Sequence, residues 1–262
     1  MSLNNYLRDL SYRYYLKSSA LETRNIDASV KALISKAKHH FGEQLKAIQV
    51  FGSYDRDTIL PRKYDSYSDV DILFTFNSSQ YDRTPDTYRT WLQKFAETHY
   101  KPFETYKSFP TVVVQRDHIA FDLVPSKQEE SFWGNNRHYI PDSSGGWMQT
   151  DPFGFKKQLA EANQSYNNIV KPIIRLLKAW NANANYPFAS YMVETFVARQ
   201  NFSGDDIYTG LLYAIEQTEL TGTQSQNKKI ESLKTAGKRV EEYIRRGEME
   251  KAKSWLHKAF PR

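Results

Sequence analysis

The strongest constraint on the fold is a change of hydrophobic pattern near residue 150. Before it, short apolar runs of strand type alternate with helical segments, and after it apolar residues recur only at helical spacings of three and four. The first pattern needs a sheet covered by helices, and the second needs helices packed on helices. The sequence therefore predicts an α+β protein: a mixed sheet with helices, and a C-terminal helical lobe.

The two predicted lobes cover residues 1–150, an α/β lobe with N-terminal helices, and residues 151–262, a helical lobe with basic C-terminal helices. Active sites commonly lie where two lobes meet, so we expect the site in the cleft between them. Strand-type runs cover residues 47–51, 69–76, 111–114 and 119–124, and the last two flank a polar turn typical of a hairpin. Helices are predicted from Asp27 to Gly42, from Asp86, near residues 152–163, 168–181, 190–200 and 205–217, and as a pair after residue 229.

Composition removes several classes of protein. The chain has no cysteine, which excludes disulfides, thiolate zinc sites and cysteine nucleophiles. No window approaches the run of about 20 apolar residues that a membrane span needs, so we expect a cytoplasmic protein with no membrane partner.

The net charge of +6 arises in the C-terminal segment, where eleven Lys and Arg face five Glu between residues 228 and 262. Ile230, Leu233, Val240 and Ile244 form an apolar stripe on that segment, so its basic residues belong to the opposite face. A solvated face is the first interpretation of these residues, and a contact with nucleic acid or an acidic protein is the second.

Two carboxylates, Asp69 and Asp71, stand at the start of the predicted strand 69–76. Side chains two residues apart in a strand lie on the same face, so this pair is side by side. Adjacent carboxylates repel each other unless a cation lies between them, and Mg²⁺ binds through such oxygen ligands together with substrate phosphates. A solvated pair at the start of a strand is the competing interpretation.

A third carboxylate, Asp122, lies in the middle of the apolar run IAFDLV. A carboxylate there is costly to bury unless it is paired or bound to a metal. If this strand lies beside the strand of Asp69, the three acids form a cluster of the kind that holds two metal ions for in-line displacement. An outward-facing Asp on a half-exposed sheet is the alternative.

Gly52 and Ser53 follow directly on the predicted strand 47–51. Glycine lets the backbone approach a phosphate closely, and a serine hydroxyl can bind it. The order along the chain raises this pair above an ordinary tight turn: strand, Gly-Ser, Asp-x-Asp at the next strand, and a third Asp on a later strand.

These motifs resemble those of the DNA-polymerase-β-like nucleotidyltransferases, which combine a Gly-Ser loop, an Asp-x-Asp pair and a third Asp; here they read GSYDRDT, SDVDILF and FDLV. HYIPDSSGGWMQTDP at 138–152, LLKAWN at 176–181 and FASYMVETF at 188–196 are similar to segments of the bacterial cyclic-oligonucleotide synthases, the cGAS/DncV-like nucleotidyltransferases or CD-NTases. The resemblance implies a polymerase-β-like core. It also implies an enzyme that condenses nucleoside triphosphates into a cyclic di- or trinucleotide second messenger, releases pyrophosphate, and acts in anti-phage signalling through a downstream effector.

The resemblance also assigns roles to residues. Asp69 and Asp71 would bind two ions of Mg²⁺ or Mn²⁺, and Asp122 would bind the catalytic ion and help to activate the attacking hydroxyl. Gly52 and Ser53 would contact the terminal phosphates of the donor, which is ATP, GTP or another nucleoside triphosphate.

In the helical lobe, the resemblance implies that Lys178 and Ser190 reach the phosphates of the donor and that Tyr191 stacks on a base. Without it, Lys178 is an ordinary exposed helix lysine and Tyr191 an ordinary core aromatic. These residues therefore depend on the resemblance more than the carboxylates do.

The chain departs from the family pattern in two places. Asp57 stands where the family usually has glycine, and ILPRKYDSY lengthens the loop before Asp69. Without cysteines the chain cannot carry the zinc module with which the animal synthase grips DNA, so we do not expect nucleic acid as a partner.

Two alternatives remain open. One is a transferase that adds a nucleotide to RNA, to a protein or to a small molecule. The other is a catalytically silent nucleic-acid sensor, against which the intact set of three carboxylates argues.

Overall fold

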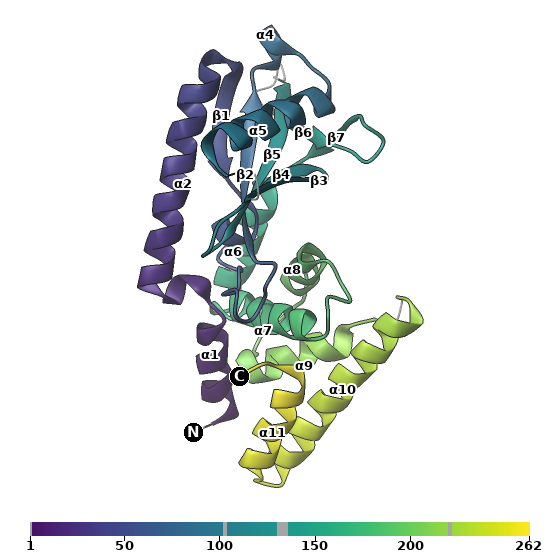
Figure 1. Cartoon of the computed structure of the whole chain (residues 1–262). Coiled ribbons are helices and arrows are strands. Elements are labelled where there is room, and N and C mark those ends of the chain that lie inside the picture. Colours follow the sequence, from purple (N-terminus) through teal and green to yellow (C-terminus); the bar gives the residue numbers. More distant parts are fainter. Residues whose placement is uncertain (1, 102–103, 130–135, 220–221) are drawn as a thin grey trace. The chain divides into compact units, whose positions relative to one another are not determined.

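The structure, a computed structural model, describes residues 2–101, 104–129, 136–219 and 222–262 and divides into two compact units (Figure 1). The sheet unit comprises Ser19–Asp57 and Tyr67–Lys157, and the helical unit comprises Met1–Ser18, Thr58–Ser66 and Gln158–Arg262. This division differs from the predicted single boundary near residue 150, because two early segments join the helical unit. α1 (Leu3–Arg13) packs against α7 (Val170–Asn183) and α9 (Ile207–Gln217).

A mixed sheet forms the sheet unit, as the sequence predicts. Its strand order is β1-β2-β5-β4-β3, with β6 beside β5 and β7 beside β6. β2 and β5 run parallel, whereas the other neighbours are antiparallel. The strands in the described residues are β1 (Leu45–Val50), β2 (Asp69–Phe76), β3 (Thr105–Ser108), β4 (Thr111–Gln115), β5 (Ala120–Glu129), β6 (Arg137–Pro141) and β7 (Trp147–Thr150).

One face of β2 packs on two helices, α2 (Ala20–Phe41) and α5 (Pro85–His99). The ring of Phe76 stacks on that of Tyr88 from α5 at 4.4 Å and meets that of Phe41 from α2 at 5.4 Å. Phe74 and Phe76 are fully buried on this face. Because side chains alternate along a strand, Asp69 and Asp71 belong to the opposite face of the sheet.

Helix α2 starts earlier than predicted, at Ala20 instead of Asp27, because the Ser19 hydroxyl caps it by accepting from the backbone N–H of Glu22 at 3.3 Å. It ends at Gly42 as predicted. Short helices complete the connections: η1 (Leu16–Ser18), η2 (Gly42–Gln44), α3 (Gly52–Asp55) and α4 (Ser78–Tyr81).

The predicted succession of helices after residue 151 is confirmed as α6 (Gly154–Ser165), α7, α8 (Ser190–Ala198), α9, α10 (Gln224–Arg245) and α11 (Met249–Ala259). All belong to the helical unit except residues 154–157 of α6, which belong to the sheet unit. α7 is buried along most of its length, including Ile173, Leu176 and Ala179. The Tyr186 hydroxyl donates to Asp65 Oδ1 at 2.7 Å, which ties the segment 58–66 to the loop after α7. None of the helices in the described residues has both the length and the apolar character to cross a bilayer.

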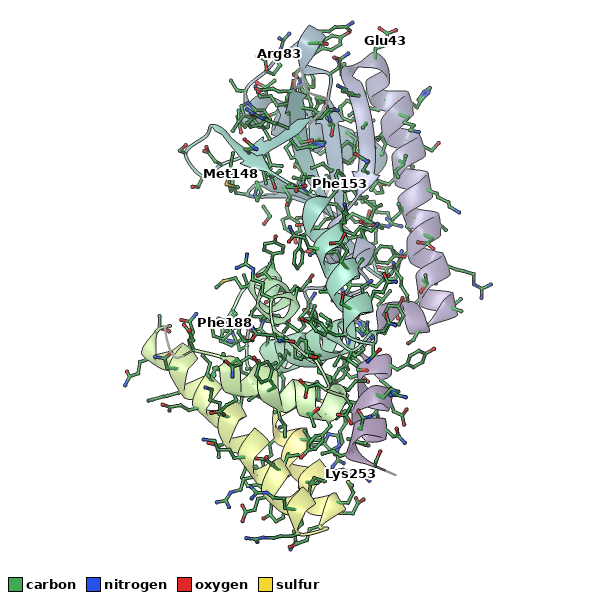
Figure 2. The ribbon with its side chains drawn as sticks, turned by 180° about the vertical axis from the view of Figure 1, so that it is seen from behind. Glu43, Arg83, Met148, Phe153, Phe188 and Lys253 are labelled. Atoms are coloured by element: carbon green, nitrogen blue, oxygen red, sulfur yellow. The ribbon has the colours of Figure 1, made fainter. Side chains whose placement is uncertain are left out.

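The apolar stripe predicted on α10 is present: Ile230, Leu233 and Val240 are buried. The helix begins at Gln224, earlier than predicted, because Thr223 and Gln226 form a capping box. Basic side chains of α10 and α11 pair with acids nearby in the chain: Arg239 pairs with Glu242 of α10 at 2.8 Å, and Lys253 of α11, labelled in Figure 2, pairs with Glu250 of the same helix at 2.7 Å.

Candidate active site

Strand register brings the three predicted carboxylates onto neighbouring strands. β2 and β5 pair in parallel, with Asp71 directly opposite Asp122 and Asp69 opposite Ala120. Paired strands lie about 4.8 Å apart. Since Asp69 and Asp71 share a face of β2 and Asp122 lies beside Asp71, the three acids occupy one face of the sheet, which is the condition that the sequence left open.

Asp122 lies in partly buried surroundings. Burial raises the pKa of this carboxyl above its ordinary value, and a hydrogen bond from Thr111 opposes that rise. The Thr111 hydroxyl is 3.3 Å from Asp122 Oδ2 and 2.8 Å from the carbonyl oxygen of Ser108, so two acceptors share its one proton. The hydrogen bond from Thr111 therefore stabilises the charged form of Asp122 only weakly, and a bound cation would stabilise it further.

Gly52 lies against Asp71. Its φ of +71° is in the left-handed region, and a Cβ atom added there would lie 1.8 Å from Asp71 Oδ2. The backbone N–H of Phe51 donates to the carbonyl oxygen of Asp71 at 3.0 Å. Only glycine therefore fits between the end of β1 and the carboxylate, and Ser53 follows directly in α3.

Three contacts within the sheet unit hold the Gly-Ser loop. The Tyr54 hydroxyl donates to Asp27 Oδ1 of α2 at 2.6 Å. Lys156 Nζ bonds Asp55 Oδ1 at 2.7 Å, and the guanidinium of Arg56 lies 5.3 Å from the centre of the Phe155 ring. Sequence reasoning missed these contacts and Thr111, because their partners are remote in the sequence and depend on packing.

Asp57, where the resemblance predicts a glycine, has a φ of +64°. This is the left-handed conformation that glycine adopts at little cost and that Asp tolerates better than most residues. The substitution therefore keeps the turn.

The donor set suits a hard divalent ion, since it consists of carboxylate oxygens on one face of two adjacent strands. As their side chains stand, the described His, Asp and Glu residues form no group of three that could hold a metal ion. The number of ions and their ligands stay predictions.

In the helical unit, the exposure of Lys178 and of Tyr191 is the opposite of what the sequence alone suggests. Lys178 on α7 is only 4% exposed and pairs with Glu194, itself 1% exposed, at 3.1 Å. Tyr191, the second residue of α8 after Ser190, is 53% exposed. An exposed lysine and a core aromatic were therefore the wrong default interpretations, while the approach of Lys178, Ser190 and Tyr191 to a nucleotide stays a prediction.

Comparison with known proteins finds a matching family, similar sequences and similar folds. The profile of the Second Messenger Oligonucleotide or Dinucleotide Synthetase domain family matches residues 1–163. A probable cyclic nucleotide synthase of Bacillus cereus is 37% identical over 79 residues, which are 30% of this chain and 24% of that protein. The CBASS oligonucleotide cyclase CdnC of Escherichia coli is 24% identical over 208 residues, which are 73% of this chain and 65% of that protein.

The fold agrees with these matches. A solved structure of CdnC from E. coli MS115-1 with ATP superposes with a TM-score of 0.76 at 14% identity, and the match covers 99% of this chain and 98% of that one. The family match covers more than half of the chain and includes the Gly-Ser loop and all three carboxylates. The chain belongs to the Second Messenger Oligonucleotide or Dinucleotide Synthetase domain family.

Proposed function

We propose that this protein is a metal-dependent nucleotidyltransferase that condenses nucleoside triphosphates into a cyclic di- or trinucleotide and releases pyrophosphate. The observation that carries the proposal is the parallel register of β2 and β5, which pairs Asp71 with Asp122. A nucleic-acid-binding module has no physical reason to place three carboxylates side by side, because they repel one another without a cation. Membership of the family supports the same reaction.

The proposed step joins two nucleotides. A sugar hydroxyl of the acceptor attacks the α-phosphorus of the donor, an O–P bond forms, and the bond to the leaving pyrophosphate breaks. Asp122 is proposed to take up the hydroxyl proton, since its raised pKa is nearer to the value that suits a general base. Asp69, Asp71 and Asp122 would hold Mg²⁺ or Mn²⁺, two ions in this proposal, which would neutralise charge on the donor's phosphates.

Gly52 and Ser53 are proposed to hold the donor's terminal phosphates. The absence of a side chain at Gly52 leaves its backbone next to Asp71, where a phosphate bound to the same ion would lie. In the helical unit, Lys178 and Ser190 are proposed to bind donor phosphates and Tyr191 to stack on a base. The exposed ring of Tyr191 supports that role, whereas Lys178 would have to divide its charge between Glu194 and a phosphate.

The proposed substrates are ATP, GTP or other nucleoside triphosphates, and the proposed product acts on a downstream effector in anti-phage signalling. The CBASS oligonucleotide cyclase among the relatives and the CdnC structure with ATP support these assignments. The proposal places the reaction in the cytoplasm, where nucleoside triphosphates are available.

The test uses purified protein, the four ribonucleoside triphosphates and Mg²⁺ or Mn²⁺, with the Asp122→Asn variant as a matched control. A cyclic product has no terminal phosphate and survives phosphatase. We expect a resistant species with the mass of two or three nucleoside monophosphates less one water for each linkage, and none with the variant. If every product is phosphatase-sensitive, or none forms until RNA or a partner protein is added, the acceptor is another molecule and cyclisation is excluded.

A further inference from the structure

A pocket lies on the helix-covered side of the sheet unit, between α2, the end of α5 and the start of β5. Its volume is about 470 Å³, within the range of small-molecule sites. Phe121 lines it and precedes Asp122 in β5, so its side chain belongs to the opposite face of the sheet from the carboxylates. The pocket is therefore distinct from the candidate active site.

The lining of this pocket is basic. Lys36, Lys101 and Arg116 contribute three cations, and Glu104 is the one acid among its lining residues in the described part of the chain. Glu104 is already engaged, because it accepts from Arg116 Nη1 at 2.9 Å and from the backbone N–H of Lys101 at 3.2 Å. The lining therefore has more basic than acidic residues.

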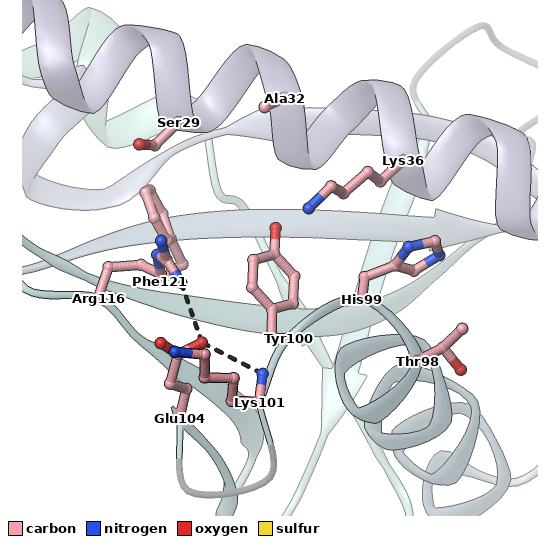
Figure 3. A pocket seen from close by; sticks show the side chains of 10 residues that line it. All are labelled: Ser29, Ala32, Lys36, Thr98, His99, Tyr100, Lys101, Glu104, Arg116 and Phe121. Atoms are coloured by element: carbon pink, nitrogen blue, oxygen red, sulfur yellow. Dashed lines mark hydrogen bonds and ion pairs between the residues drawn. The ribbon is translucent and has the colours of Figure 1, made fainter.

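Two of the cations gather around one aromatic ring. Lys36 Nζ lies 4.6 Å from the ring centre of Tyr100, and the guanidinium carbon of Arg116 lies 5.9 Å from it. Figure 3 shows Lys36 from α2 and Tyr100 from the end of α5 pointing toward each other into the pocket. Burial raises the pKa of Tyr100 to about 12, so its hydroxyl stays neutral and can donate a hydrogen bond.

His99 adds a further donor or acceptor to the same wall. Its Nε2 atom is buried and has no hydrogen-bond partner among the described residues. Burial lowers the pKa of His99, and the nearby His40 and Lys36 lower it further, as expected beside other basic groups. An anion bound between these groups would reduce their mutual repulsion.

We propose that this pocket binds a phosphate-bearing small molecule of about nucleotide size. Lys and Arg are the usual protein partners of phosphate. The volume exceeds what inorganic phosphate alone would fill, and Tyr100 and Phe121 provide apolar surface for an organic portion. This proposal does not rest on the reaction proposed for the carboxylates, and either can fail without the other.

The test measures binding by calorimetry and locates it by hydrogen–deuterium exchange of the full chain. Adenosine 5′-monophosphate is the first probe and inorganic pyrophosphate the second, both in EDTA, which prevents metal-assisted binding at the carboxylates. We expect protection of residues 29–36 and 98–101 by adenosine monophosphate. Tighter binding of the nucleotide than of pyrophosphate would show that the organic portion contributes.

Lys36→Gln should weaken binding about tenfold or more, the effect of losing one charge-assisted hydrogen bond. Lys36→Arg should retain most of the affinity, which controls for misfolding. Lys38→Gln removes an exposed lysine of the same helix outside the pocket lining and should change the affinity less than about twofold.

Three outcomes would overturn the proposal. One is no binding of either probe at millimolar concentration. Another is protection confined to residues 51–57 and 69–71, which would place the anion at the carboxylates. The third is an equal loss of affinity in the Lys36→Gln and Lys38→Gln variants, which would indicate a diffuse electrostatic attraction.

Discussion

The sheet unit and the helical unit position their candidate functional residues by different means. In the sheet unit, backbone hydrogen bonds between β2 and β5 set Asp71 opposite Asp122, and alternation along β2 sets Asp69 on the same face. In the helical unit, Lys178 depends on a side-chain partner, Glu194, and on burial between packed helices. Alternation along a strand therefore fixes the face of each side chain, and the pairing of strands fixes its neighbour, whereas a helical side chain depends on packing for both.

The largest effect is expected from replacing the three carboxylates that strand pairing brings onto one face. Asp69→Asn, Asp71→Asn and Asp122→Asn should each lower turnover in Mg²⁺ by about 100-fold or more, because each removes a charge that the reaction needs. Thermal stability should be equal or higher, since repulsion among the acids is relieved. Asp117→Asn, an exposed acid in the β4–β5 turn, is the control for turnover and melting temperature. Near wild-type turnover in any of the three variants would refute the role of that residue.

The second prediction concerns Lys178, which is held by its ion pair with Glu194. Lys178→Met leaves Glu194 charged and buried, so it should lower the free energy of unfolding by about 3–5 kcal/mol. Replacing both, by Lys178→Met with Glu194→Leu, should recover at least half of that loss in urea denaturation. Turnover should stay low in the double variant if Lys178 also binds phosphate. A double variant as unstable as the single one would show that the loss does not come from the buried charge of Glu194.

A third prediction separates backbone strain from the contact with Asp71. Gly52 and Gly145 both have positive φ, but an added Cβ meets Asp71 only at Gly52 and nothing within 4 Å at Gly145. Gly52→Ala should therefore cost about 1–3 kcal/mol more than Gly145→Ala and also reduce turnover. Equal losses of melting temperature and unchanged turnover in the Gly52 variant would mean that Asp71 moves aside at no cost.

A smaller effect is expected from the weak hydrogen bond of Thr111. That bond favours the charged form of Asp122, so Thr111→Val should raise the pKa of Asp122 further. The acidic limb of the kcat/KM profile should then move to higher pH by less than about one unit, since a shared bond is worth less than about 1.4 kcal/mol. Thr111→Ser keeps the hydroxyl and should restore the profile; a profile that moves to lower pH would contradict the assignment.

The raised pKa of Asp122 also predicts how its contribution to folding stability changes with pH. Because the pKa of Asp122 is higher in the folded than in the unfolded chain, its contribution to stability rises as the pH falls through the folded value. Comparing wild type with Asp122→Asn in urea across that range isolates this contribution, which should be absent from the variant.

The smallest effect is expected at the basic helices. Lys238, Arg239, Arg245 and Arg246 are exposed, and three of them already pair with Glu241 or Glu242. Replacing all four by Gln should leave basal turnover unchanged, since exposed pairs contribute little. Turnover with and without duplex RNA or DNA across a salt series checks this; stimulation that disappears in the variant would show that a polyanion binds here.

The sequence alone determined the alternation of strands and helices and the face shared by Asp69 and Asp71. Each follows from local rules: a period of two in strands and a period of 3.6 in helices. The sequence also predicted the strand of Asp122 from its apolar run. It singled out Asp122 because a carboxylate in such a run needs a specific environment.

Only the tertiary structure decided which strand lies beside β2, which hydroxyl contacts Asp122, and that Lys178 is buried while Tyr191 is exposed. It also assembled the basic pocket, whose lining residues come from α2, the end of α5 and the turn before β5. These features depend on pairing and packing between residues far apart in the chain. Local sequence patterns do not contain that information. They determine on which face of its own helix or strand a side chain lies, but not which residue it contacts.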